Sequence, residues 1–176
     1  MKTLRGFGDV MTWIETGKRT YELRAGSDVV ATLSWAKGFG SPGVGETADG
    51  KVLIERAGLL RPRVVVREDL PSTPGDAPAS QRAPLVTLDV DLGGRGLARS
   101  RSEVTFNWAP QNLWRSIWAF EQGGKALLTF ESEAGISFAT KVKLAPGADT
   151  PDLGALLLLG SAVAVFIGED SSIFGV

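Results

Sequence analysis

Hydrophobic and polar residues alternate along most of the chain, with the period of two that is typical of half-buried β-strands. The clearest example is the segment 29–35, in which one face of the predicted strand carries Val29, Ala31, Leu33 and Trp35. The same alternation predicts about ten strands, among them residues 21–25, 29–35, 51–56, 63–67, 86–92, 104–108, 114–120, 126–131 and 136–144. Short strands at regular spacing indicate a β-sandwich or a β-barrel.

One segment near the carboxyl end has a different pattern. Residues 153–167 contain no charged side chain, and Ser161 carries their only polar side chain. Residues that can cap, begin or end a helix flank the segment, namely Asp149, Thr150, Pro151 and Gly168. We therefore expect a helix over residues 151–167. Because it is apolar on every face, it must be enclosed by protein or by lipid.

The length of this helix favours enclosure by the protein's own strands. Residues 151–167 span about 25 Å as a helix, which is short against a bilayer hydrocarbon core of about 30 Å. A barrel of more than eight strands has room for a helix. We therefore predict a mainly β fold, a closed antiparallel barrel of about 12 strands enclosing the carboxyl-terminal helix, as one domain over residues 1–176. A tail-anchored membrane protein is the alternative, because the small residues of segment 160–164 also suit helix pairing in lipid.

Two connecting segments interrupt the strand pattern. Residues 37–45 are rich in glycine, and we expect them to form a loop. Residues 69–84 contain four prolines and few apolar side chains, which favours a surface loop. The alternative is a connector between two domains, but neither side would then have enough core to fold alone.

A faint repeat relates two of the predicted hairpins. Residues 21–33 match residues 118–130 in kind, at a constant offset of 97 positions. The match indicates a pseudo-symmetric barrel, or it reflects only the sequence preferences that all hairpins share.

Composition narrows the possible chemistry. The chain has 19 Lys and Arg against 20 Asp and Glu, so it lacks the basic excess of a nucleic-acid-binding domain. Cysteine and histidine are absent, which removes thiolate nucleophiles, Ser-His-Asp triads and the commonest metal ligands. The amino terminus has no apolar signal-peptide core. We therefore expect a cytoplasmic, non-enzymatic protein without a cofactor or a bound metal.

Four stretches carry a resemblance to a known family: YELRAGSDVVATLSW, DGKVLIER, WAFEQGGKALLTFE and PDLGALLLLGSAVAVFIGED. In their order and in the closing helix, the chain resembles the tubby-like carboxyl-terminal superfamily, and within it the LURP-one-related and phospholipid scramblase-like proteins. The likeness covers residues 18–170. It implies a twelve-stranded barrel around a hydrophobic helix, binding of phosphoinositides through basic side chains, and association with membranes.

Basic side chains are the candidate ligand-binding residues. They form three groups in the sequence, which are Arg61, Arg63 and Arg67, then Arg95, Arg99 and Arg101, then Lys141 and Lys143. Arginine offers forked donors to phosphate and lysine adds a point charge, so two groups that meet in space would bind an anionic headgroup or another phosphorylated ligand. The alternative is that these residues are the solvated outer faces of strands.

These observations predict a binding or scaffold module for anionic phospholipid or another phosphorylated ligand, at the periphery of a membrane. One alternative is a carrier of small apolar ligands, which requires a deep apolar pocket at the mouth of the barrel, beside one end of the helix.

Three further patterns have a structural interpretation. The glycine-rich segment 93–96 is expected to be a turn and not a phosphate-binding loop, because a strand follows it where a helix is needed. Two acidic pairs are interpreted as solvated strand faces and not as cation ligands: Asp89 with Asp91, and Glu131 with Glu133. We assign to the core the aromatic strand face that carries Trp114, Trp118 and Phe120. Packing explains these residues more simply than an aromatic platform for a ligand.

Overall fold

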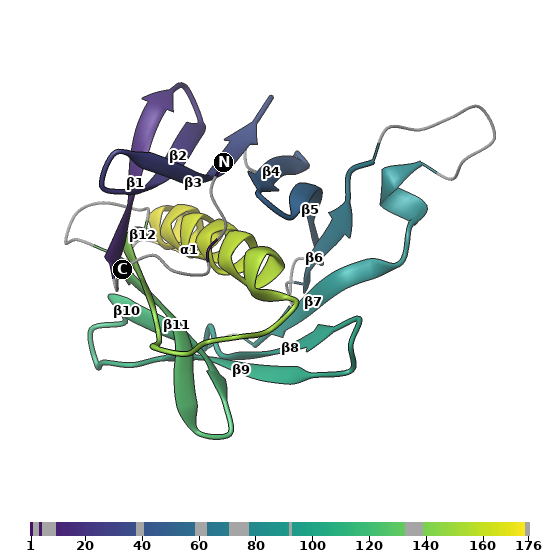
Figure 1. Ribbon diagram of the computed structural model, residues 1–176. Coiled ribbons are helices and arrows are strands. Elements are labelled where there is room, and N and C mark those ends of the chain that lie inside the picture. The colour runs from purple at the N-terminus through teal and green to yellow at the C-terminus, as the bar shows by residue number, and fades with distance from the viewer. Residues whose placement is uncertain are drawn as a thin grey trace.

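The computed structural model describes residues 1, 4, 10–37, 41–58, 63–70, 78–91, 93–132 and 139–174. In it, twelve antiparallel strands form one closed barrel around a carboxyl-terminal helix, which confirms the predicted fold (Figure 1). Each strand pairs with the next one in the chain, and β1 closes the ring by pairing with β12. The elements are β1 (Val10–Gly17), β2 (Thr20–Ala25), β3 (Asp28–Trp35), β4 (Gly43–Thr47), β5 (Gly50–Ala57), β6 (Arg63–Glu68), η1 (Ala79–Gln81), β7 (Pro84–Val90), β8 (Gly96–Ser100), β9 (Thr105–Pro110), β10 (Ile117–Gln122), β11 (Lys125–Ser132), β12 (Ala139–Leu144) and α1 (Leu153–Phe174).

The alternation of side chains makes the wall of the barrel. On β7 the side chains of Val86, Leu88 and Val90 are buried, whereas Thr87 and Asp89 between them are only partly buried. Antiparallel pairing places residues of the same face side by side on neighbouring strands. The inward faces of the strands therefore form one apolar lining, which packs against the helix as a single core.

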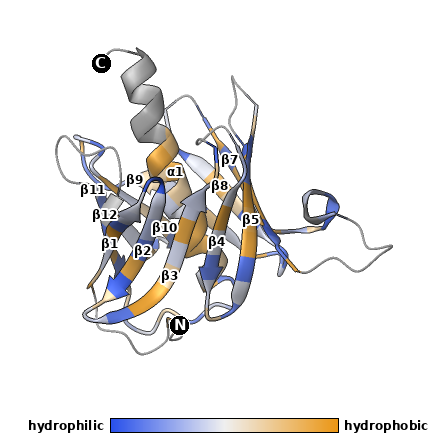
Figure 2. Ribbon diagram, turned by 90° about the horizontal axis from the view of Figure 1, so that it is seen from above, coloured by the Kyte–Doolittle hydropathy of each residue, from blue (hydrophilic) through white to orange (hydrophobic). Residues whose placement is uncertain are grey.

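Helix α1 lies inside this lining over residues 153–166 (Figure 2). The consecutive residues 156–159 are all leucines with no exposed surface. Since successive residues of a helix are about 100° apart, four of them in a row point in all directions around the axis. The barrel therefore covers every side of this part of the helix.

Small residues of the helix allow the wall to come close. Gly160 lies against the ring of Phe130, and a Cβ added at Gly160 would be 2.3 Å from the end of that ring. The next residue, Ser161, joins helix and wall: its Oγ accepts a 3.0 Å hydrogen bond from the indole N–H of Trp13 and donates one of 2.8 Å to the carbonyl of Leu157. The uncharged segment is thus narrowed where strands approach it.

The helix begins as the sequence predicts but ends later. The Oγ1 atom of Thr150 accepts a 3.4 Å hydrogen bond from the amide of Asp152, which is the geometry of an amino-terminal cap. The predicted end at Gly168 is wrong, because α1 continues to Phe174. A glycine inside a helix costs only about 1 kcal/mol relative to alanine, so it does not have to end one.

The sequence repeat corresponds to a structural repeat. The β2–β3 and β10–β11 hairpins pair in the same register, so that Tyr21 lies opposite Leu33 and, 97 positions later, Trp118 lies opposite Phe130. Both hairpins also shift register at equivalent positions. The offset therefore relates two hairpins of one geometry, and not only two stretches of similar composition.

The assignment of Trp114 to the core is wrong. Trp118 and Phe120 are buried, but Trp114 precedes β10 and is 89% exposed. The strand cannot extend back to it, because Asn112 closes a turn in which its Oδ1 accepts a 3.0 Å hydrogen bond from the amide of Ser116.

The sequence pattern also misplaces some strand boundaries. β4 lies partly within the predicted loop 37–45, since Gly43 pairs in the sheet and leaves room for the indole ring of Trp35. β1 was not predicted at all, because only Met11 and Trp13 of its eight residues are buried and two positions make a weak pattern. The last predicted strand, 136–144, corresponds to β12 over residues 139–144, and its first three residues lie outside the described ones.

An up-and-down barrel alternates its connections between two ends. We call the end where α1 begins the helix-start end; it holds the connections that follow even-numbered strands. The opposite end, called the far end, holds the connections that follow odd-numbered strands. The proline-rich segment 69–84 leads from β6 to β7 at the helix-start end and contains η1, with residues 71–77 outside the described ones. The strands on its two sides pair with each other.

Candidate functional site

Two of the predicted arginines meet on one carboxylate of the outer wall. Arg63 on β6 and Arg99 on β8 lie on either side of Asp89 on β7, with Nε–Oδ1 and Nη1–Oδ2 distances of 2.6 and 2.9 Å. All three side chains are more than one third exposed, so solvent screens these ion pairs. The two basic groups do come together, and the protein's own carboxylate lies between them.

The neighbouring arginines are also paired. Arg67 Nε is 3.1 Å from Glu55 Oε2, and its Nη1 donates a 2.6 Å hydrogen bond to the carbonyl of Arg82. Arg101 Nη1 is 2.9 Å from Glu68 Oε1. These contacts tie β5, β6, the β6–β7 connection and the β8–β9 connection together. The outer arginines therefore serve the barrel wall and are poorly placed to bind a separate anion.

Arg95 differs from them because it lies in the β7–β8 turn. The Oδ1 atom of Asp91 accepts hydrogen bonds from the amides of Gly93 and Arg95, at 2.8 and 2.9 Å, which holds this segment as a turn as the sequence predicts. Asp91 is thus a turn residue beyond the end of β7, and the interpretation of Asp89 and Asp91 as one strand face is wrong. The Arg95 side chain is exposed and forms no ion pair with any residue that the structure describes.

The remaining predicted residues do not join the arginines. Lys141 and Lys143 are on β12, which pairs with β11 and β1 and lies away from β6–β8 in the strand order. Lys143 Nζ is 3.3 Å from Glu131 Oε2. Arg61 and Glu133 lie outside the described residues.

The connections at the far end are strongly basic. In their described residues we find one carboxylate, Asp91, and five cationic side chains, which are Lys18, Arg19, Lys37, Arg95 and Arg115. Asp91 is already bound to turn amides. Only Arg95 of these cations belongs to the groups singled out from the sequence. The others were missed because they are scattered along the chain, with only Lys18 and Arg19 adjacent, and because their common end depends on β1 and on the true start of β10, which the sequence pattern did not predict.

The connections at the helix-start end have the opposite balance. Their described residues include two cations, Arg82 and Arg101, and five carboxylates, which are Asp49, Asp69, Glu103, Asp149 and Asp152. Both arginines are engaged by backbone or carboxylate groups of the same end. The strand connections are therefore basic at one end of the barrel and acidic at the other, although the overall net charge is only −1. The carboxyl-terminal part of α1, which runs toward the far end, adds Glu169 and Asp170 there, so cations still outnumber carboxylates at that end.

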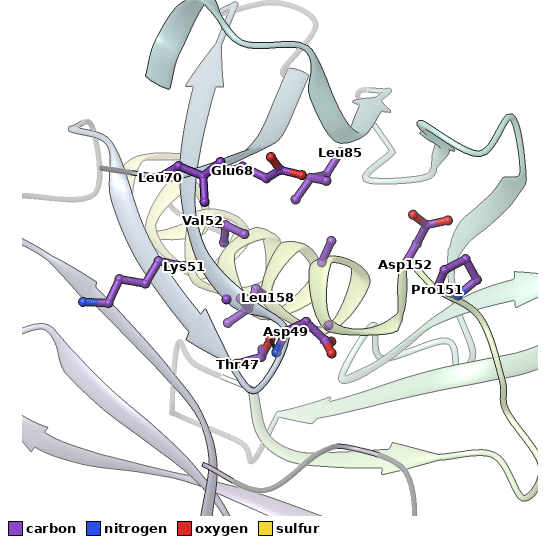
Figure 3. A pocket seen from close by; sticks show the side chains of 13 residues that line it. Thr47, Asp49, Lys51, Val52, Glu68, Leu70, Leu85, Pro151, Asp152 and Leu158 are labelled. Atoms are coloured by element: carbon purple, nitrogen blue, oxygen red, sulfur yellow. Dashed lines mark hydrogen bonds between the residues drawn. The ribbon is translucent and has the colours of Figure 1, made fainter. Parts of the chain in front are cut away.

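A cavity of about 390 Å³ lies at the helix-start end, beside the first turns of α1 (Figure 3). Apolar side chains contributed by β5, the β6–β7 connection, β7 and α1 line part of it, and they are Val52, Leu70, Leu85, Ala155 and Leu158. Its charged lining residues are the three carboxylates Asp49, Glu68 and Asp152 and the cation Lys51. Glu68 is paired with Arg101, and Asp152 Oδ2 accepts a 2.5 Å hydrogen bond from Ser102.

Within the part of the chain that the structure describes, no cluster of acidic side chains has the arrangement of a metal site. In the same residues, no helix combines the length and the hydropathy of a transmembrane segment. The chain matches no protein-family model, no curated protein and no solved structure.

Proposed function

We propose that the protein is a non-enzymatic binding module that docks the far end of its barrel on an anionic phospholipid surface. The observation that carries this proposal is the charge of the strand connections at that end, with five cations against one carboxylate in the described residues. The five cations belong to turns at one end of a single closed barrel, so an anionic surface that faces this end attracts all of them. Each Lys or Arg near such a surface contributes about 1 kcal/mol.

The resemblance to the tubby-like, LURP-one-related and scramblase-like proteins supports the same class of ligand. It predicts a cytoplasmic protein at the membrane periphery that binds lipid headgroups through basic side chains. The outer arginines of β6 and β8, expected from the sequence to contact the headgroups, are neutralised by Asp89. We therefore propose that the cations in the turns of the far end make these contacts instead.

Co-sedimentation with vesicles tests the proposal. We expect the protein to bind vesicles of phosphatidylcholine with phosphatidylserine and not vesicles of phosphatidylcholine alone, with an affinity that falls as salt rises. The double variant Lys37→Ala/Arg95→Ala removes two charges of the far end and, at about 1 kcal/mol each, should bind about thirtyfold more weakly.

A matched control changes the net charge equally at the acidic end. Lys51→Ala/Lys125→Ala removes two exposed lysines from the starts of β5 and β11, and its binding should stay within about twofold of wild type. Equal loss in both double variants would mean that only net charge matters, and no binding by wild type would mean that the proposed ligand is wrong.

The cavity beside the helix favours a second candidate function, the carriage of a small ligand. Its volume is within the range of small-molecule sites, about 300–1,000 Å³. The lining combines apolar side chains with carboxylates, so the ligand that fits has an apolar body and a positive charge, which differs from the purely apolar ligand expected from the sequence. Such a ligand would bind at the helix-start end, and charge removal at the far end would leave its binding unchanged.

A further inference from the structure

Two adjacent apolar side chains are fully presented to solvent at the far end. Leu113 and Trp114, here called the apolar tip, are 97% and 89% exposed. The next most exposed large apolar side chain among the described residues, Leu70, is 54% exposed. Single exposed apolar residues are common on protein surfaces, but a neighbouring leucine and tryptophan exposed to this degree are not required by the fold.

The loop that carries the apolar tip is held in place. Asn112 Oδ1 accepts hydrogen bonds from the amides of Ser116 and Ile117, at 3.0 and 3.3 Å. The indole N–H of the buried Trp118 donates a 2.8 Å hydrogen bond to the carbonyl of Arg115, whose φ of 53° completes the turn. Because these bonds fix the backbone on both sides of the tip, its exposure is a property of the folded loop.

The apolar tip lies among the cations of the far end. Its loop connects β9 to β10, and Arg115 directly follows Trp114 in the same turn. Tryptophan is enriched at the level of lipid headgroups because its ring is apolar and its N–H is polar. A protein partner fits less well, since lysine is depleted in protein interfaces relative to the rest of the surface and the far end includes Lys18 and Lys37.

We propose that Leu113 and Trp114 enter the headgroup region of an anionic bilayer, and that they add an apolar anchor to the attraction of the surrounding cations. This inference rests on the proposed function, because it takes the far end as the membrane-facing end. An apolar anchor has a distinct signature: the part of the binding that it supplies persists at a salt concentration that screens the charges.

The protein's own fluorescence tests the anchor. Of the five tryptophans, Trp13, Trp35, Trp108 and Trp118 are buried, so Trp114 is the one that solvent reaches. On adding phosphatidylcholine–phosphatidylserine vesicles we expect the emission to shift to the blue, acrylamide quenching to fall, and brominated lipids to quench the signal. Trp114→Ala should remove all three responses and leave the four buried tryptophans unaffected.

Affinities complete the test. Affinity is measured by co-sedimentation in about 0.5 M salt, where the Debye length is about 3–5 Å and the charges are screened. Under this condition we expect Leu113→Ala and Trp114→Ala each to lower the affinity about tenfold, because each removes a side chain whose burial favours binding by an amount like that of a leucine. The matched control is Leu70→Ala, an exposed leucine at the opposite end, which should bind as wild type does. Both tip residues are exposed, so neither change should disturb folding.

The outcomes separate this inference from the proposed function. If wild type binds anionic vesicles but the Trp114 emission does not respond, the anchor is wrong and electrostatic docking stands. If wild type binds no vesicle, the proposed function fails and the anchor with it. If the emission of Trp114 instead depends on protein concentration without vesicles, the tip is a contact between copies of the chain, and the anchor is likewise overturned.

Discussion

Substitution of Gly160 by alanine tests the enclosure of the helix directly. In an exposed helix this change would stabilise the protein by about 1 kcal/mol, because alanine favours the helix over glycine. Here the added Cβ would lie 2.3, 2.5 and 2.9 Å from three atoms of the Phe130 ring. Contacts this short force the ring or the helix to move.

The ring of Phe130 has little space to move into. It is fully buried, and its centroid lies 5.5 Å from that of Trp108 and 6.0 Å from that of Phe120. Overpacking of a dense core costs about 1–3 kcal/mol, and we take the upper part of this range because the clash involves three ring atoms. After subtraction of the helix-propensity gain, Gly160→Ala should lower the free energy of unfolding by about 1–2 kcal/mol.

Urea unfolding followed by near-UV circular dichroism measures this change, and the melting temperature should fall by about 2–8 °C. Gly154→Ala is the matched control in the same helix, where the nearest atoms are the ends of the Asp49 and Thr47 side chains. Since the Asp49 carboxylate can rotate away, the gain in helix propensity is not outweighed here, and this variant should be as stable as wild type or more stable by up to about 1 kcal/mol. A Gly160→Ala variant as stable as wild type would refute the close contact of helix and wall.

Two further substitutions test polar contacts of the barrel. Ser161→Ala removes the acceptor of the Trp13 indole N–H in the core and should lower the free energy of unfolding by about 1–3 kcal/mol. In a double-mutant cycle measured by thermal unfolding, Trp13→Phe combined with Ser161→Ala should cost less than the sum of the two single changes. Additive costs would mean that the hydrogen bond contributes nothing to stability. Asp89→Asn removes the shared ion-pair partner of Arg63 and Arg99. Because these pairs are solvent-exposed, the loss in the free energy of unfolding should stay below about 1 kcal/mol and vanish in 1 M salt. A larger loss that does not depend on salt would contradict the screening argument.

The elements that the sequence predicts best are those with an unambiguous local pattern. Val86, Leu88 and Val90 alternate with polar residues, and they form the inner face of β7. Where the pattern is short or interrupted, as in β1, or where a strand contains glycines, as in β4, local composition does not distinguish strand from loop. Trp114 shows the same limit, because an aromatic residue next to a strand looks like part of it until the turn at Asn112 is known.

The candidate binding residues were harder to predict, because pairing depends on register. Arg63 and Asp89 are 26 positions apart in the chain, and they become direct neighbours only because β6 and β7 pair in one particular register. From the sequence alone, Arg63 and Arg99 had the appearance of available cations. Their neutralisation by a single aspartate became visible only with the three strands side by side.

The sequence by itself determined that residues 153–167 must be hidden from water, since an uncharged helix has no face that favours solvent. It also placed Lys37 and Arg95 between predicted strands, whereas the turns that hold Lys18 and Arg115 were recognised only in the structure, because β1 was not predicted and Arg115 lay in the predicted strand 114–120. Only the tertiary structure decided that these turns share one end, because a closed up-and-down barrel gathers every second connection in one place. Electrostatic attraction depends on distance in space, so cations far apart in the chain act together only after the ring has closed.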